Sequence, residues 1–337
     1  MLYLEQKEKY NNSIPTYIHA WLDVIESMQN ENTYKLAWGR AILECIYTDK
    51  CYEINGEKVI IELNNIAKYM LKYYWNQIFF FNLKQAPISA KQPVIANITL
   101  DMINEYKKMT DSAIPVWFDE ALKVFGKTKY YDSIIKKIVK ILPENVSWRF
   151  KMINGEEVNL YEYDNKNRSD KVVFLYDEAL LLKEYSIIIS KLLNYKWTQL
   201  LEKYNYAPKI ASKVNGISEA KLRRNSLTKY KNELLKQFED GIPRDFYTNE
   251  PLDLDDISVD HVIPWSFMYS DDIWNLVLTS KSNNSSKSNS IPSEKIIEKL
   301  KDRNIHLTEY LDAKFKIELE DSIKNNYVDK YYFECRM

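Results

Sequence analysis

The stretch that decides the fold of the C-terminal third is SVDHVIPWSFMYSDDIWNLVLTSKSNNSSKSNSIPSE, residues 258–294. It opens on a short run that ends at Asp260 and His261, returns through a second apolar run at 276–279, and then reaches a polar segment around Asn284. Short apolar runs bounded by turn residues are typical of strands. The stretch therefore predicts two short strands followed by a short helix.

This stretch resembles the HNH endonuclease family. It is similar to the HNH domain of the single-protein, RNA-guided CRISPR nucleases in four elements: an Asp-His-x-x-Pro-x-Ser-Phe opening from Asp260, a Val-Leu-Thr run ending at Thr279, an Asn-x-x-Lys-Ser element from Asn284, and the Pro-Ser-Glu that ends at Glu294. The resemblance implies a ββα-metal arrangement and hydrolysis of phosphodiester bonds in nucleic acid. It covers only about 40 of the 337 residues.

The residue types at these positions suit that chemistry. Asp260 and Asn284 offer oxygen ligands, which favour Mg²⁺ or Mn²⁺ over an ion that prefers thiolates. His261 is the candidate general base, because a neutral imidazole accepts a proton near neutral pH. Lys287 lies about one helical turn after Asn284 and is expected to add positive charge beside the phosphate. By the resemblance, the amide of Asn275 fixes the loop that carries the base.

One feature departs from many members of the family. A common version of the domain has Cys-x-x-Cys pairs that build a structural zinc site, whereas the corresponding stretch here, residues 244–248, has no cysteine. We expect aromatic packing to replace the zinc, by Phe246, Tyr247, Trp265 and Trp274.

Nucleic-acid binding needs a local basic patch, because the formal net charge is only −1. Residues 202–236 contain nine basic side chains, one of which is Lys213, and only three acidic ones. A solvated helix face is the alternative interpretation of such a run. The candidate phosphate contacts are Arg223, Arg224, Lys229 and, within the motif, Lys281.

The first part of the chain shows helical periodicity from about residue 14 to 85. An aromatic cluster at helical spacing, Tyr69 to Trp75, is expected to be core packing rather than a surface for stacking bases. Around the turn dipeptide Asn154-Gly155, residues 146–163 predict a β-hairpin. A further strand at 172–176 and a helix from Asp177 to about Tyr204 follow.

These patterns predict an α+β protein with three parts. A helical N-terminal domain spans 1–145, a β-hairpin with a basic helical region spans 146–236, and the HNH nuclease domain with C-terminal helices spans 237–337. The three cysteines are too few and too badly spaced for a disulfide framework, and the N-terminus lacks a signal sequence. We therefore expect a cytoplasmic protein without a membrane segment.

The function expected from these features is that of a metal-dependent DNA endonuclease in restriction or anti-phage defence. An RNA-cleaving HNH nuclease stays open, since the site recognises a phosphate and not a sugar. A non-catalytic protein that binds nucleic acid or a partner through an HNH scaffold also stays open. A homodimer and a partner protein of a defence system are further alternatives that the sequence leaves undecided.

Overall fold

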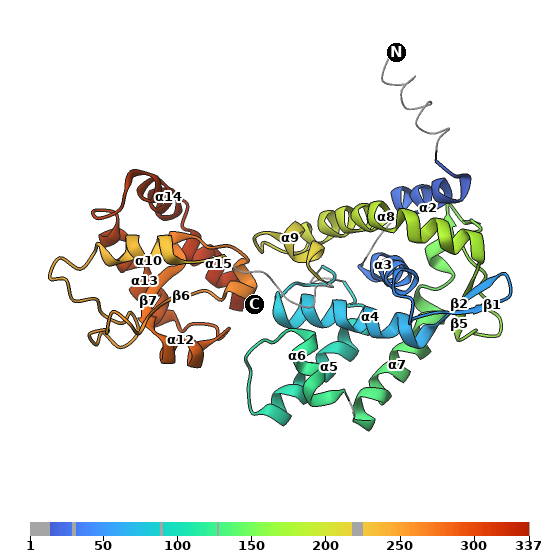
Figure 1. Ribbon diagram of the computed structural model, residues 1–337, viewed down its shortest axis with the longest axis horizontal. Coiled ribbons are helices and arrows are strands. Elements are labelled where there is room, and N and C mark those ends of the chain that lie inside the picture. Colours follow the sequence, from blue (N-terminus) through green and yellow to red (C-terminus); the bar gives the residue numbers. More distant parts are fainter. Residues whose placement is uncertain (1–13, 29–31, 88–89, 127, 218–224, 337) are drawn as a thin grey trace, which may run out of the picture.

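The buried apolar side chains form two clusters, which correspond to the two lobes of Figure 1. The computed structural model describes residues 14–28, 32–87, 90–126, 128–217 and 225–336. We call residues 14–217 the helical lobe and residues 225–336 the C-terminal lobe. The protein mixes helices with a few short strands, in agreement with the α+β class. Within the described ranges, no helix has the length and hydrophobicity needed to cross a bilayer.

The helical lobe is built from helices that bury their apolar faces against one another. They are α2 (Thr16–Ser27), α3 (Tyr34–Tyr47), α4 (Leu63–Trp75), α5 (Val94–Thr110), α6 (Phe118–Phe125), α7 (Lys129–Asn145), α8 (Tyr176–Glu202) and α9 (Ile210–Asn215), with a π-helix at Asn76–Phe80 and a 3-10 helix at Arg149–Lys151. Helix α8 packs along α2 and α3. Tyr73, Tyr74 and Trp75 are completely buried, which confirms that their cluster is core packing.

A small sheet interrupts the helices in the region 14–85, which the periodicity predicted to be mainly helical. Strands β1 (Glu53–Asn55) and β2 (Lys58–Glu62) form an antiparallel hairpin, and β5 (Lys171–Leu175) pairs with β2. The expectation of helix at 53–62 is wrong because Gly56, at a φ of +60°, makes a tight turn that a helix cannot contain. The strand expected at 172–176 is confirmed as β5.

The hairpin expected at 146–163 is present only in part. The turn at Asn154-Gly155 is confirmed, since both residues have positive φ, but it joins strands of only two residues, β3 (Met152–Ile153) and β4 (Glu156–Glu157). The expected strand at 158–163 is reduced to one bridge, between Glu162 and Val173. The chain turns inward there instead, because Tyr161 is buried and its hydroxyl donates to a backbone carbonyl 2.6 Å away.

The C-terminal lobe is organised around a two-stranded antiparallel sheet. Strands β6 (Ile257–His261) and β7 (Leu276–Ser280) pair with Asp260 opposite Val277, and α12 (Lys281–Lys287) follows directly. The sequence therefore places two strands and a helix in the expected order. Around them lie α10 (Thr228–Leu235), α11 (Trp265–Met268), a 3-10 helix at Ile273–Asn275, α13 (Glu294–Leu307), α14 (Ala313–Lys324) and α15 (Tyr327–Arg336).

The two lobes meet at the segment that follows β6. Lys213 of the helical lobe is completely buried, and its Nζ donates to the carbonyl of Phe267 and lies 4.9 Å from the centre of that ring. Trp265 packs in the core of the helical lobe rather than beside Phe246. The expectation that Trp265 helps to replace a zinc site is therefore wrong, because the turn after β6 directs this side chain toward the helical lobe.

Candidate active site

Strand β6 and helix α12 bring four of the expected site residues together. Asp260 and His261 end β6 and are buried, with 5% and 7% of their surface exposed. The amide Nδ2 of Asn284 donates to Ser258 on the same strand at 2.6 Å. The Nζ of Lys287 donates to the carbonyl of His261 at 2.6 Å and lies 3.1 Å from Oδ2 of Asp260. Lys287 thus pairs with the carboxylate that was expected to bind metal.

The imidazole of His261 is held by a carboxylate that the sequence analysis did not assign. Its Nε2 lies 3.0 Å from Oδ1 of Asp271. The hydrogen bond with His261 lowers the pKa of Asp271, although burial opposes this. No group in the described part of the chain bonds to Nδ1 of His261, so a ring that donates through Nε2 presents Nδ1 as an acceptor. The pair Asp271-Asp272, placed just after the Asp-His motif, was the available sequence signal.

Tyr247 contributes a hydroxyl to the site as well as packing. Its OH donates to Oδ2 of Asp260 at 2.5 Å. Burial raises the pKa of Tyr247 far above its ordinary value, and the neighbouring carboxylate raises that pKa further. The phenol therefore stays protonated and fixes one oxygen of Asp260.

Two buried polar residues hold the backbone around these groups. Asn275 is completely buried, and its amide accepts from the N–H of Ile263 at 2.8 Å and donates to the same residue's carbonyl at 2.9 Å. Asp245 accepts from the hydroxyl of Thr279, the N–H of Ser280 and the amide of Asn283, all within 2.9 Å. Asn275 thereby shapes the turn after His261, and Asp245 joins β7 to α12.

The candidate phosphate contacts are scattered. Arg223 and Arg224 lie outside the described residues. Lys229 is exposed, and its charge is close enough to help lower the pKa of Asp271. Lys281 donates to the carbonyl of Asp255 at 2.7 Å, at the opposite end of β6 from Asp260 and His261. Lys213 does not belong to a surface patch, because it is buried between the lobes.

The residues present fit a divalent ion that keeps most of its water. No group of three or more His, Cys, Asp or Glu side chains that could hold a metal occurs in the parts of the chain that the structure describes. Asp260 and Asn284 each use one polar atom in the bonds above, and no described residue donates to the Oδ1 of either. Two hard oxygens with water and phosphate in the other positions suit Mg²⁺, which dehydrates reluctantly.

Comparison with known proteins agrees with this geometry. Residues 245–293 match the HNH endonuclease family, and they form an HNH endonuclease domain. A segment of 61 residues is 44% identical to part of the protein named CRISPR-associated endonuclease Cas9 from Streptococcus mutans, covering 17% of this chain. The match spans 4% of that relative's length, so this chain corresponds to only a small part of it. No solved structure matches this chain.

Proposed function

We propose that the protein is a metal-dependent endonuclease that hydrolyses phosphodiester bonds in DNA. The observation that carries this proposal is the pairing of His261 with Asp271 beside the buried carboxylate of Asp260. In the proposed reaction, Nδ1 of His261 takes a proton from the attacking water. Asp271 orients the ring and stabilises the positive charge that forms on it, as carboxylates do in other base dyads.

The remaining site residues act on the phosphate and on the base. Asp260 and Asn284 would hold a Mg²⁺ or Mn²⁺ ion through oxygen, and a bound ion supplies Lewis-acid stabilisation of the negative charge at phosphorus. Lys287 neutralises Asp260 and carries positive charge into the phosphate site. Asn275 keeps the turn after His261 in place.

DNA and a role in restriction or anti-phage defence are the substrate and setting that we propose. The CRISPR-associated relative supports defence, and nothing in the geometry of the site requires a deoxyribose sugar. RNA is therefore the second candidate substrate. A non-catalytic scaffold is disfavoured because binding alone needs neither the His261–Asp271 pair nor the free oxygens of Asp260 and Asn284.

The test incubates the full chain with labelled DNA and, separately, labelled RNA, in Mg²⁺ or in EDTA. The wild type should cleave DNA only when the metal is present. His261→Ala should lose about 10²- to 10⁴-fold in rate, the usual contribution of a general base, while binding DNA as before. The matched control is His306→Ala, an exposed histidine that packs on Tyr310. Cleavage by His261→Ala within about tenfold of wild type, or cleavage that persists in EDTA, would overturn the proposal. Preference for RNA would change the substrate only.

A further inference from the structure

An arginine in the C-terminal lobe has donors that no group in the described part of the chain satisfies. Arg303 lies on α13, and its Nε and Nη1 are buried without a hydrogen-bond partner among the described residues. Its Nη2 reaches only the carbonyl of Trp274, at a long 3.5 Å. A guanidinium carries five donors, and burying them unpaired is costly. Such a group in a folded protein calls for a partner that the described residues do not supply.

Arg303 is one of the residues that line a cavity of about 140 Å³, together with Val277 and Leu278 of β7. Arg244, Lys299 and Asp245 also line it. Arg244 is already paired with Asp240 at 3.1 Å. Lys299 makes no described ion pair, and its Nζ lies 5.2 Å from the centre of the Phe246 ring.

The one carboxylate of the cavity, Asp245, can balance only one of these cations. Both oxygens of Asp245 are occupied: Oδ1 by the N–H groups of Tyr247 and Thr248, and Oδ2 by the donors of β7 and α12 named above. Burial lowers the pKa of Arg303 to about 9, so the side chain is still cationic at neutral pH. With Arg244 paired to Asp240, the described lining residues therefore leave the cavity with a net positive charge.

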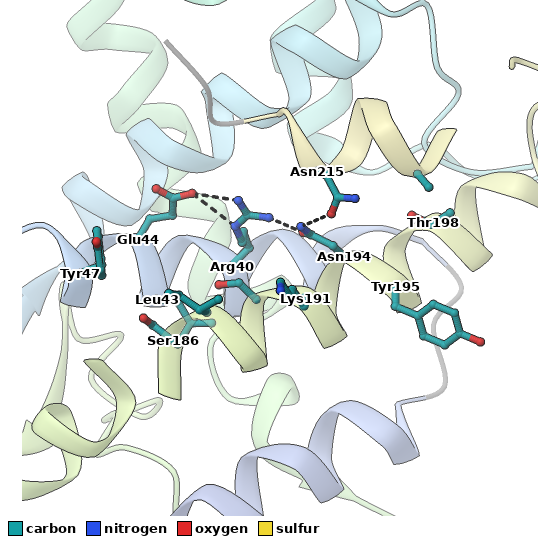
Figure 2. Close-up of a pocket in the computed structure, with 13 residues that line it drawn as sticks. Arg40, Leu43, Glu44, Tyr47, Ser186, Lys191, Asn194, Tyr195, Thr198 and Asn215 are labelled. Carbon is teal, nitrogen blue, oxygen red and sulfur yellow. Dashed lines mark hydrogen bonds and ion pairs between the residues drawn. The ribbon is translucent and has the colours of Figure 1, made fainter. Parts of the chain in front are cut away.

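Arg40, in contrast, is a buried arginine whose side chain has hydrogen-bond partners. Arg40 lies at a cavity of about 640 Å³ in the helical lobe (Figure 2). It pairs with Glu44 at 3.2 Å and donates to Asn194, whose own amide donates to Asn215 at 2.9 Å. The polar side chains at that cavity are hydrogen-bonded to one another, whereas Arg303 and Lys299 make no ion pair among the described residues.

We propose that the cavity lined by Arg303 and Lys299 is a binding site for a phosphate-type oxyanion. A guanidinium binds such an anion through parallel N–H bonds, and the adjacent ammonium adds charge without demanding a fixed geometry. The anion is either inorganic phosphate or a phosphodiester of bound nucleic acid, since both present the same oxygens. This site is separate from the proposed metal position and does not depend on cleavage.

The first experiment measures binding of inorganic phosphate to the full chain by calorimetry in EDTA, at constant ionic strength against chloride. Arg303→Met should lower the affinity for phosphate at least about tenfold, the loss expected for one charge-assisted hydrogen bond. Lys299→Ala should also lower this affinity. Lys295→Ala removes an exposed lysine from the same helix and should change nothing. If Arg303→Met does not fold, Arg303→Lys and Lys299→Ala carry the test. Absence of phosphate binding in the wild type, or equal binding in all variants, overturns the proposal.

The second experiment identifies the source of the anion with fluorescent duplex DNA, also in EDTA. If a backbone phosphate is the ligand, inorganic phosphate competes with DNA, and Arg303→Met lowers the log–log salt slope by about one. If free phosphate is the ligand, Arg303→Met loses phosphate but keeps its DNA affinity. Either result sustains the site. Equal effects of Arg303→Met and Lys295→Ala on both ligands overturn it. Neither assay needs catalysis, so both binding results can still be interpreted if the nuclease proposal fails.

Discussion

Replacing Lys213 by Met should make the protein's stability less dependent on pH. Lys213 is completely buried between the lobes, with the carbonyl of Phe267 as its hydrogen-bond acceptor and the rings of Phe267 and Phe81 at 4.9 and 6.0 Å. Burial lowers the pKa of Lys213 from 10.5 to about 7. Methionine has a similar length and no charge, so it removes the titration while filling most of the same space.

The sign follows from the two pKa values. Above pH 10.5 the lysine is neutral in both the folded and the unfolded chain. Between 10.5 and about 7 the unfolded chain binds a proton that the folded protein does not, so the free energy of unfolding falls as the pH falls. Below about pH 7 the lysine is charged in both the folded and the unfolded chain, and the whole free-energy cost of burying it lowers the stability. At about 1.4 kcal/mol for each pH unit, the lysine should account for roughly 3 kcal/mol between pH 6.5 and 9.5.

The measurement is urea unfolding of the wild type and Lys213→Met at several pH values in this range. The difference between the two free energies of unfolding isolates Lys213, because tyrosines and cysteines that titrate at high pH are common to both proteins. Losing the hydrogen bond to Phe267 adds an offset of about 1–3 kcal/mol that does not vary with pH. Lys203→Met, at an exposed position after α8, is the matched control. Parallel pH profiles for wild type and Lys213→Met would refute the reasoning.

Three further outcomes are expected in the C-terminal lobe. Asp271→Asn should lower the cleavage rate about 10- to 10³-fold with little change in KM, because His261 loses the group that orients it; a kinetic assay that finds KM alone altered would contradict this. Tyr247→Phe should lower the free energy of unfolding by about 1–3 kcal/mol, since Asp260 loses a buried donor, and an unchanged urea midpoint would show that this hydrogen bond is replaced by water. Asp245→Asn should destabilise the fold by about 3 kcal/mol or more, because several buried donors lose a charged acceptor; thermal unfolding within a degree of wild type would exclude that role.

The sequence alone was sufficient to identify the HNH domain and the order of its elements. The residues from Asp260 to Glu294 are close together in the chain, and their spacing follows from two short strands and one helical turn. Local periodicity therefore predicted β6, β7 and α12 in order, and the comparisons confirm the domain. Helices of the helical lobe could be predicted for the same reason, since the spacing of apolar residues indicates which face of a helix is buried.

Only the tertiary structure decided which distant groups meet. Strand β2 pairs with β5 from more than a hundred residues away, and Lys213 is buried against Phe267 rather than exposed in a basic patch. The local sequence around a charged residue does not indicate whether another lobe of the protein will bury it. The same holds for Asp271 and Arg303, whose importance lies in the presence or the lack of a partner. Such pairing depends on how separate elements pack, because contacts between elements are set by packing and not by local propensity.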